Sequence, residues 1–266
     1  MRISLILSCP RGSQIPLNYQ YEISSWVYWT LGRANPEFAE WLHSQGYALS
    51  GSKAFKLFTF SHFAIDPPFK IEPSNGVISV GSGKVRLQLS FLLNQPLEHF
   101  VAGIFQNQQF TLGNSRVRPV SFSVDRIEIL PPPVFSGCMR FRTLSPICIS
   151  ANTPGGYAQY RHPEDVDYAG LMQENLLNKL AIADHYDFPA QSKGAEEASF
   201  DFQLLSEPKR KGITLKAFSS AETKVIGYMF DFELRAAPTL LEVGYYAGFG
   251  VENAQGFGCV GQIARN

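Results

Sequence analysis

The chain has 266 residues, of which 45% are hydrophobic, 13% aromatic and 17% charged. This composition excludes an intrinsically disordered protein and provides enough apolar residues for a sizeable core. Its 23 basic residues balance 23 acidic ones, so no global basic field points to a polyanionic partner. The first 130 residues carry 11 basic and 8 acidic side chains and the remainder carry 12 and 15, which permits a local basic surface without requiring one.

The four cysteines are scattered along the chain, with no CxxC pair and no histidine at zinc-finger spacing. This pattern argues against a disulfide scaffold and a structural zinc site, and we expect neither a metal nor a cofactor. The first apolar run is too short for a signal peptide, and no stretch approaches the ~18–20 apolar residues of a membrane span. We therefore expect a cytoplasmic protein in a reducing compartment, with no membrane partner.

The first half of the chain predicts mixed helices and strands. A strand at residues 2–8 precedes a helix at 18–31, whose apolar residues recur at helical spacing. A second helix begins at Asn35, a capping residue followed by proline and an acid, and it should end at Gly46. Further strands rich in β-branched and aromatic residues are predicted at 56–61, 76–80, 85–92, 109–112 and 121–130, with a helix at 96–105.

A proline run, residues 131–133, interrupts the chain at its midpoint. We place a domain boundary there, between an N-terminal domain at 1–130 and a C-terminal domain at 131–266. The second half repeats the plan of the first, although no identity between the halves is visible. It predicts a strand at 140–150, a helix at 166–183 and strands at 199–205, 212–217 and 225–235.

The most unusual segment is glycine-rich and lies near the C-terminus. Glycines recur at Gly244, Gly248, Gly250, Gly256 and Gly258, in a GFG-x5-GFG spacing. Glycine permits positive φ and a close approach of backbone N–H groups to a ligand. The segment is neither a Rossmann fingerprint nor a P-loop, because it opens no helix and lacks the GK[ST] ending. A tight hairpin that packs two strands is the alternative interpretation.

An ordered set of segments carries a resemblance that covers nearly the whole chain. They are residues 16–21 (PLNYQY), 35–43 (NPEFAEWLH), 56–61 (KLFTFS), 143–147 (TLSPI) and 243–258 with its GFG-x5-GFG spacing. With these segments the sequence resembles the CRISPR-associated repeat-RNA processing endoribonucleases, the Cas6 family of the repeat-associated mysterious protein (RAMP) superfamily. The resemblance implies an α+β fold with two tandem ferredoxin-like, or RRM-like, domains.

The resemblance also implies an activity. The family cuts precursor CRISPR RNA within each repeat, without a metal, by attack of a ribose 2′-hydroxyl on the adjacent phosphate. The expected products are a 2′,3′-cyclic phosphate and a 5′-hydroxyl. CRISPR repeat RNA is therefore the expected partner. Subunits of a CRISPR effector complex, or a second copy in a homodimer, remain open as further partners.

Three residues match the family's catalytic positions. His43 is the candidate general acid or base, Tyr28 matches the family's tyrosine, and Lys56 its lysine. Helical phase turns Tyr28 and His43 each about 140° from an apolar reference residue, so both can reach a shared cleft. The alternatives are a C-terminal capping histidine, a solvated lysine at a strand end and an interface tyrosine, with His62 as the reserve candidate.

RNA binding is expected at two further places. Lys209, Arg210 and Lys211 are predicted to form the tip of a basic hairpin, with an ordinary charged turn as the alternative. In the glycine-rich loop, backbone N–H groups are expected to meet RNA while Phe249 and Phe257 anchor the core. The loop residues expected to bind RNA are Gly248, Gly250, Gly256 and Gly258 through their backbone, and Asn253 and Gln255 at base edges.

Two other functions remain compatible with the sequence. The chain can be a noncatalytic RNA-binding subunit of a CRISPR effector complex that keeps the glycine-rich loop. It can also be a two-domain protein that uses this loop for a small phosphorylated ligand. The polar segment at residues 44–52 bears on the choice, because a mobile loop there would leave His43 poorly positioned without RNA.

Overall fold

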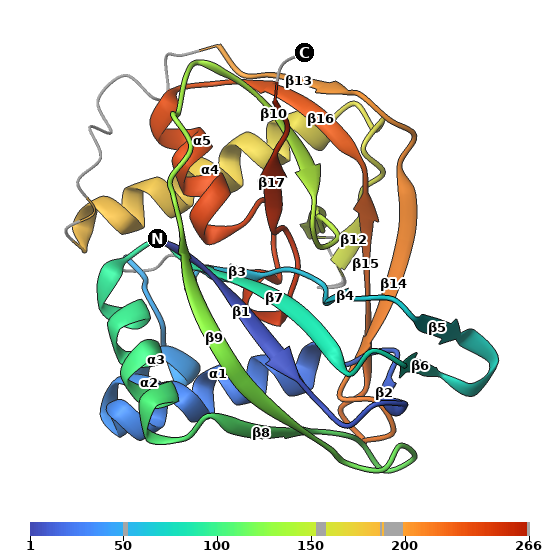
Figure 1. Ribbon diagram of the computed structural model, residues 1–266. Coiled ribbons are helices and arrows are strands. Elements are labelled where there is room, and N and C mark those ends of the chain that lie inside the picture. The colour runs from blue at the N-terminus through green and yellow to red at the C-terminus, as the bar shows by residue number, and fades with distance from the viewer. Residues whose placement is uncertain (50–52, 153–157, 187, 189–198, 265–266) are drawn as a thin grey trace.

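Two βαββαβ units lie next to each other in the computed structural model, which describes residues 1–49, 53–152, 158–186, 188 and 199–264 (Figure 1). The first unit is built from β1 (Arg2–Ser8), α1 (Gln20–Ala34), β3 (Phe58–Phe60), β7 (Lys84–Phe91), α3 (Asn94–Gln106) and β9 (Val120–Leu130). Its sheet has the order β3-β7-β1-β9, and β8 (Gln109–Leu112) extends it at one edge.

The second unit repeats this topology. It contains β10 (Cys138–Thr143), α4 (Tyr168–His185), β13 (Asp201–Leu204), β16 (Asp231–Arg235), α5 (Pro238–Ala247) and β17 (Val260–Gln262). Its sheet has the order β13-β16-β10-β17. In both sheets the four strands of the motif therefore lie in the order second, third, first, fourth, which is the ferredoxin-like arrangement. The expected fold class, two tandem ferredoxin-like domains, is confirmed.

The core of the first unit lies between its sheet and its helices. Leu5 on β1 pairs in register with Leu87 on one side and Ile127 on the other, and Leu5 and Leu87 are fully buried. On α1, Ile23, Val27 and other apolar residues at helical spacing turn their side chains into this core. Burial of such a stripe is what holds a 15-residue helix on a sheet, since a helix of this length is marginal alone.

The helix α2 (Pro36–Ser44) begins where the sequence predicts. The side-chain Oδ1 of Asn35 accepts a hydrogen bond from the Phe38 backbone N–H at 3.0 Å, as an N-cap does. After the helix, Tyr47 and Phe55 exchange two backbone hydrogen bonds of 2.8 Å, which tie the ends of the following loop together. Residues 50–52 of the polar segment lie outside the described residues.

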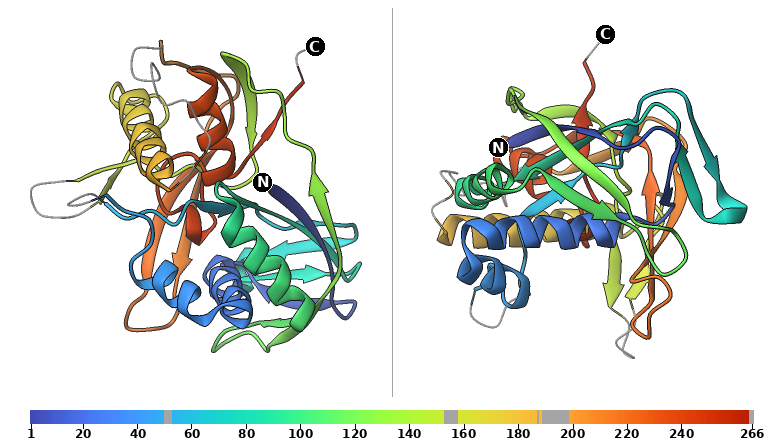
Figure 2. Two further views of the ribbon diagram at one scale, coloured as in Figure 1. Left: turned by 90° about the vertical axis from the view of Figure 1, so that its left-hand side faces the viewer. Right: turned by 60° about the horizontal axis from the view of Figure 1, so that its bottom comes forward.

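Several short elements decorate the two units. The strands β2 (Ser13–Pro16), β5 (Phe69–Glu72) and β6 (Val77–Val80) form a small sheet, and the β5–β6 hairpin projects from the body (Figure 2). β14 (Lys209–Leu215) and β15 (Thr223–Met229) form a hairpin that runs from the second unit along the first (Figure 1). The remaining elements are β4 (Ala64–Ile65), η1 (Pro73–Asn75), β11 (Ser150–Asn152), β12 (Ala158–Tyr160) and η2 (Asn253–Gln255).

Three sequence expectations need correction. The strand expected at 140–150 ends at Thr143. The strand expected at 225–235 divides at Phe230, because β15 pairs with β14 whereas β16 joins the main sheet. The segment before the glycine-rich loop is helical, since α5 reaches Ala247 and includes Gly244.

The two units share a polar junction. The buried Arg2 guanidinium on β1 donates to the backbone carbonyls of Val260 and Tyr245, and it stacks 3.6 Å from the Tyr245 ring. All four cysteines are free thiols. Among the described helices, none combines the length and the apolar character that crossing a membrane requires.

Candidate functional site

A cavity of about 240 Å³ brings the three predicted catalytic residues together. Tyr28 comes from α1, His43 from the last turn of α2, and Lys56 from the segment before β3. The opposite wall comes from the second unit and consists of residues 251–255, which include η2. The cavity therefore lies between the two units, with titratable side chains on one wall and the glycine-rich loop on the other.

Tyr28 and His43 are in direct contact. Their rings meet edge to face with centroids 4.9 Å apart, and Phe58 packs against Tyr28 at 5.7 Å. The contact follows from the short connection at Asn35, which folds α2 back against α1. Tyr28 is half-buried and His43 is exposed. An exposed imidazole beside a fixed ring can accept or donate a proton at a bound substrate.

Lys56 reaches the same turn of α2. Its Nζ donates a hydrogen bond of 2.8 Å to the backbone carbonyl of His43, one of the carbonyls that a helix C-terminus leaves without an intrahelical partner. The lysine is thereby held beside the histidine. Partial burial lowers the pKa of the Lys56 ammonium. Burial has the opposite effect on the phenol and raises the pKa of Tyr28, so its hydroxyl stays protonated at neutral pH.

The glycine-rich loop packs inside the protein, which corrects one expectation. Gly248, Gly250, Gly256 and Gly258 are all buried and have positive φ. The N–H groups of Gly248, Gly256 and Gly258 donate to the carbonyls of Gly244, Asn253 and Pro146. They are therefore not free to meet RNA. A Cβ at Gly256 would lie 2.5 Å from the Phe60 ring, so close packing against β3 is the physical reason for glycine there.

Asn253 and Gln255, the two side chains expected to read bases, differ in the hydrogen bonds that they make within the protein. Asn253 is engaged internally: its Nδ2 donates to the carbonyls of Phe249 and Phe257 at 3.1 Å each, and its Oδ1 accepts from Lys179 at 2.7 Å. This geometry argues against a role in base reading. Gln255 lines the cavity, and its buried Oε1 accepts no hydrogen bond from the described residues. Phe249 and Phe257 are fully buried, which confirms them as core anchors.

The basic triplet lies elsewhere than expected. Lys209, Arg210 and Lys211 are exposed, but they begin β14, whereas the turn of the β14–β15 hairpin comes at residues 216–222. The predicted hairpin tip is therefore wrong. The prediction fails because the proline and glycine that flank the triplet mark the entry to a long strand rather than a turn. Alternation along β14 places Lys209 and Lys211 on one face and Arg210 on the other.

The reserve candidate, His62, lies outside the catalytic cavity. Its backbone N–H donates to the Leu144 carbonyl at the junction of the units, and its buried Nε2 has no hydrogen-bond partner among the described residues. Burial, together with the nearby charge of Lys211, lowers the pKa of His62 to about 4. The imidazole is therefore neutral at physiological pH, whereas His43 is the exposed histidine of the cavity.

Sequence reasoning missed three residues around this site. Lys53 and Glu252 line the cavity and add one charge of each sign. Lys179 on α4 is buried directly behind the loop and donates to it. Nothing in the local pattern singles out Lys179, because a lysine in a helix is ordinarily a solvated residue. Lys53 lies next to the matched KLFTFS segment, and that proximity was the signal available for it.

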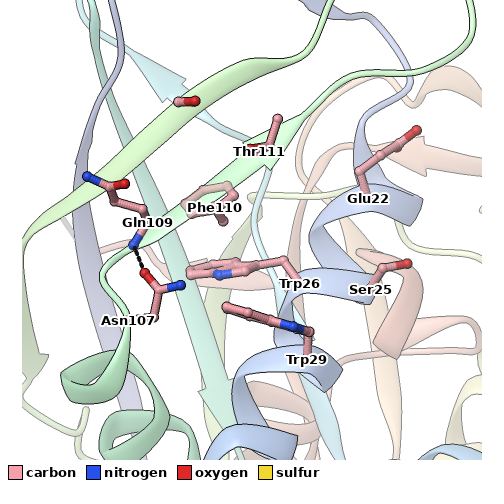
Figure 3. Close-up of a pocket in the computed structure, with 9 residues that line it drawn as sticks. Glu22, Ser25, Trp26, Trp29, Asn107, Gln109, Phe110 and Thr111 are labelled. Carbon is pink, nitrogen blue, oxygen red and sulfur yellow. Dashed lines mark hydrogen bonds between the residues drawn. The ribbon is translucent and has the colours of Figure 1, made fainter.

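A larger cavity of about 550 Å³ lies between α1 and β8, well away from this chemistry (Figure 3). Trp26 and Phe110 stack at its floor with centroids 4.0 Å apart. Among the described residues that line it, Glu22 is the only acid or base, and burial raises the pKa of its carboxyl. The side chains suited to acid–base chemistry therefore gather at the smaller cavity. Among the described residues, no three His, Cys, Asp or Glu side chains are grouped to hold a metal ion.

Comparison with known proteins gives matches along the whole chain. The family model for the N-terminal part of CRISPR-associated protein Cas6 matches residues 14–128, and the model for its C-terminal part matches residues 130–261. The CRISPR-associated endoribonuclease Cas6 1 of Methanocaldococcus jannaschii is 30% identical over 98% of this chain and 92% of its own length. The CRISPR-associated endoribonuclease Cas6 of Pyrococcus furiosus is 27% identical over 94% of this chain and 84% of its own length.

Solved structures show the same fold. A Cas6-related protein from Pyrococcus furiosus superposes with a TM-score of 0.79 at 24% identity, covering 100% of this chain and 99% of the other. A structure of a CRISPR-associated protein Cas6 superposes with a TM-score of 0.72 at 27% identity, covering 99% of both chains.

Proposed function

The chain belongs to the Cas6 family of CRISPR-associated proteins, and from this premise we propose that it is an endoribonuclease that processes precursor CRISPR RNA by cutting within each repeat. The observation that carries the proposal is the convergence of Tyr28, His43 and Lys56 on one cavity between the two units. Proton transfer and charge neutralisation, the two needs of RNA cleavage, are both available among these groups.

We propose the following roles. The ribose 2′-hydroxyl gives its proton to solvent water as its oxygen attacks the adjacent phosphorus, and the bond from phosphorus to the 5′-oxygen breaks. His43 gives the leaving 5′-oxygen its proton. Its place on the cavity wall supports this role, because an exposed imidazole there can reach the leaving group. The products are a 2′,3′-cyclic phosphate and a 5′-hydroxyl.

Lys56 and Tyr28 act on the crowded phosphate in this mechanism. The Lys56 ammonium offsets the negative charge that builds up on the phosphoryl oxygens. Tyr28 donates a hydrogen bond as a neutral phenol, because burial raises its pKa and so disfavours a phenolate base. Because the leaving oxygen and the phosphoryl charge each have a protein group and water takes the 2′ proton, this mechanism uses no metal, and we propose that cleavage is metal-independent.

The test is cleavage of RNA that carries the host's own CRISPR repeat, in EDTA, with analysis of the product ends. We expect the wild type to leave a cyclic phosphate, and His43→Ala to lose ~10²-fold or more in single-turnover rate. His185→Ala is a matched control, because His185 is also an exposed histidine in the last turn of a helix, α4. It should cut like the wild type.

Two outcomes would overturn parts of the proposal. If the wild type and His43→Ala both bind the repeat and neither cuts, the chain is a noncatalytic RNA-binding subunit. If cleavage needs a divalent metal, the metal-independent mechanism fails while the endoribonuclease assignment stands. Co-purification with effector-complex subunits and the oligomeric state in solution would test the two further partners, an effector complex and a homodimer.

A further inference from the structure

We propose that Lys179 is a positioning residue that fixes the loop wall of the RNA site from behind. The inference rests on the proposed function, because the loop that Lys179 holds is the wall opposite Tyr28 and His43. Lys179 itself does not line the cavity and does not touch the catalytic side chains. Its role would be to set where RNA can bind, without taking part in the chemistry.

The contacts of Lys179 saturate its ammonium. Its Nζ donates to the backbone carbonyls of Gly248 at 2.6 Å and Gly250 at 2.7 Å, and to the Asn253 side-chain Oδ1 at 2.7 Å. An ammonium has three N–H donors, and each has an acceptor here. All three acceptors belong to the glycine-rich loop, so one side chain ties together residues that span its first half.

Asn253 passes this constraint to the rest of the loop and to the first unit. Its Nδ2 bridges the carbonyls of Phe249 and Phe257, one on each side of η2. The Phe257 carbonyl also accepts a 2.8 Å hydrogen bond from the Thr59 hydroxyl on β3. A continuous set of hydrogen bonds therefore runs from α4, through the loop, to the strand next to Lys56.

The cost of this arrangement points to a specific role. Lys179 is 1% exposed, and its three acceptors are all neutral oxygens. Burying an ammonium without a carboxylate partner is unfavourable, and burial accordingly lowers the pKa of Lys179. An apolar side chain of similar length would fill the space, but it would leave these acceptors without donors. The lysine is thus suited to hold a conformation, and packing alone does not require it.

The experiment compares Lys179→Met with Arg2→Met in the full chain. Arg2 is also a buried cation that donates to backbone carbonyls, but its acceptors lie outside residues 248–258. Two quantities separate binding from chemistry. They are the Kd for repeat RNA with a 2′-deoxy substitution at the mapped cleavage position, and the single-turnover rate at saturating repeat RNA. Amide hydrogen exchange in residues 248–258 reports on the loop without RNA.

We expect Lys179→Met to raise the Kd by ~10-fold or more, to speed exchange in residues 248–258, and to leave the saturated rate within ~3-fold of the wild type. Arg2→Met should lower the melting temperature without raising the Kd. The proposal is overturned if Lys179→Met leaves the Kd unchanged, if the saturated rate falls while the Kd does not change, or if loop exchange stays at the wild-type level.

A second variant covers poor folding of Lys179→Met. Asn253→Ala removes one acceptor of the ammonium and both bridges across η2, so it should reproduce the rise in Kd and in loop exchange. Wild-type Kd and exchange in that variant would also overturn the proposal. If the wild-type protein itself fails to bind or cut repeat RNA, the proposed function fails, and the exchange data alone decide whether Lys179 holds the loop.

Discussion

The two walls of the candidate cavity differ in how many hydrogen bonds hold them to the rest of the protein. On the wall from the first unit, His43 is exposed at the end of α2, and Lys56 donates a hydrogen bond to the His43 backbone carbonyl. Behind the wall from the second unit, the glycines that flank residues 251–255 are buried, and the Lys179 ammonium donates to Gly248, Gly250 and Asn253. Substitutions on the first wall should therefore change rate with little effect on stability, and substitutions on the second should change stability and binding.

The largest effect is expected at Gly250. A Cβ there would lie 2.2 Å from the Cys148 carbonyl oxygen, and its φ of +74° disfavours any side chain. We expect Gly250→Ala to lower the free energy of unfolding by about 2–4 kcal/mol, the combined cost of overpacking and backbone strain. Thermal or urea unfolding would measure it.

Gly76→Ala is the matched control for this prediction. Gly76 also has a positive φ, +65°, but a Cβ there would meet nothing within 4 Å. Gly76→Ala should lower the free energy of unfolding by about 1 kcal/mol, because backbone strain alone contributes. If both variants lost the same free energy of unfolding, the loop would accommodate a Cβ at Gly250 without resistance. The second wall would then be no more rigid than the first.

On the wall from the first unit, Tyr28→Phe tests whether a substitution changes the rate of cleavage without changing stability. Removing the hydroxyl leaves the ring contacts with His43 and Phe58 in place. We expect the single-turnover rate to fall by about 10-fold, equivalent to ~1.4 kcal/mol, with the melting temperature nearly unchanged. A loss of stability without a loss of rate would make Tyr28 a structural residue of the α1–α2 contact.

The strong local signals of the sequence explain how much of the fold could be predicted. The cap at Asn35 and the helical stripe on α1 act within a few residues, and both helices form where expected. The repeated strand and helix plan predicts two α+β halves, whereas the ferredoxin-like fold was implied by the family resemblance. Helix α5 was missed because Gly244 and its neighbours read as a turn, although tertiary packing in the second unit keeps this segment helical.

The candidate site shows the limit of the same reasoning. The phases of Tyr28 and His43 predict that both leave their apolar faces, and the structure brings them into contact. The glycine-rich loop predicts RNA contact because glycine permits positive φ and a close approach to a ligand. The sequence could not show its packing, since its neighbours in space, Phe60 and the Cys148 carbonyl, are distant in sequence. The domain boundary at residues 130 and 131, between the end of β9 and the proline run, stays a prediction, as do the catalytic roles.

The burial of His62 predicts a smaller effect, a dependence of stability on pH. Burial lowers the pKa of His62 to about 4, whereas an unfolded chain binds this proton near pH 6.5. Between these values the unfolded state holds the extra proton, so stability is lost as the pH falls from about 6.5 to about 4. We expect the free energy of unfolding to fall by about 1–2 kcal/mol over this range. This is less than the energy equivalent of the whole pKa shift, because the ring is partly exposed.

Urea unfolding at a series of pH values would measure how the free energy of unfolding depends on pH. His62→Gln should flatten the dependence over this range. An unchanged pH dependence in His62→Gln would show that the junction between the units admits the charged imidazole.

The smallest expected effect concerns the basic strand, where neighbouring cations face opposite ways. Lys209 and Lys211 share their face of β14 with the buried Ile213 and Leu215, and the charge of Lys211 contributes to the lowered pKa of His62 at the junction of the units. If RNA crosses this junction, Lys211→Gln should weaken binding by a few-fold and reduce the salt slope of the Kd by about 0.7. Arg210→Gln, on the other face, should change either quantity less. Lys70→Gln, on the projecting β5 strand, should change neither. An equal effect of Arg210→Gln and Lys211→Gln would mean that the triplet attracts RNA through its total charge and does not contact phosphates individually.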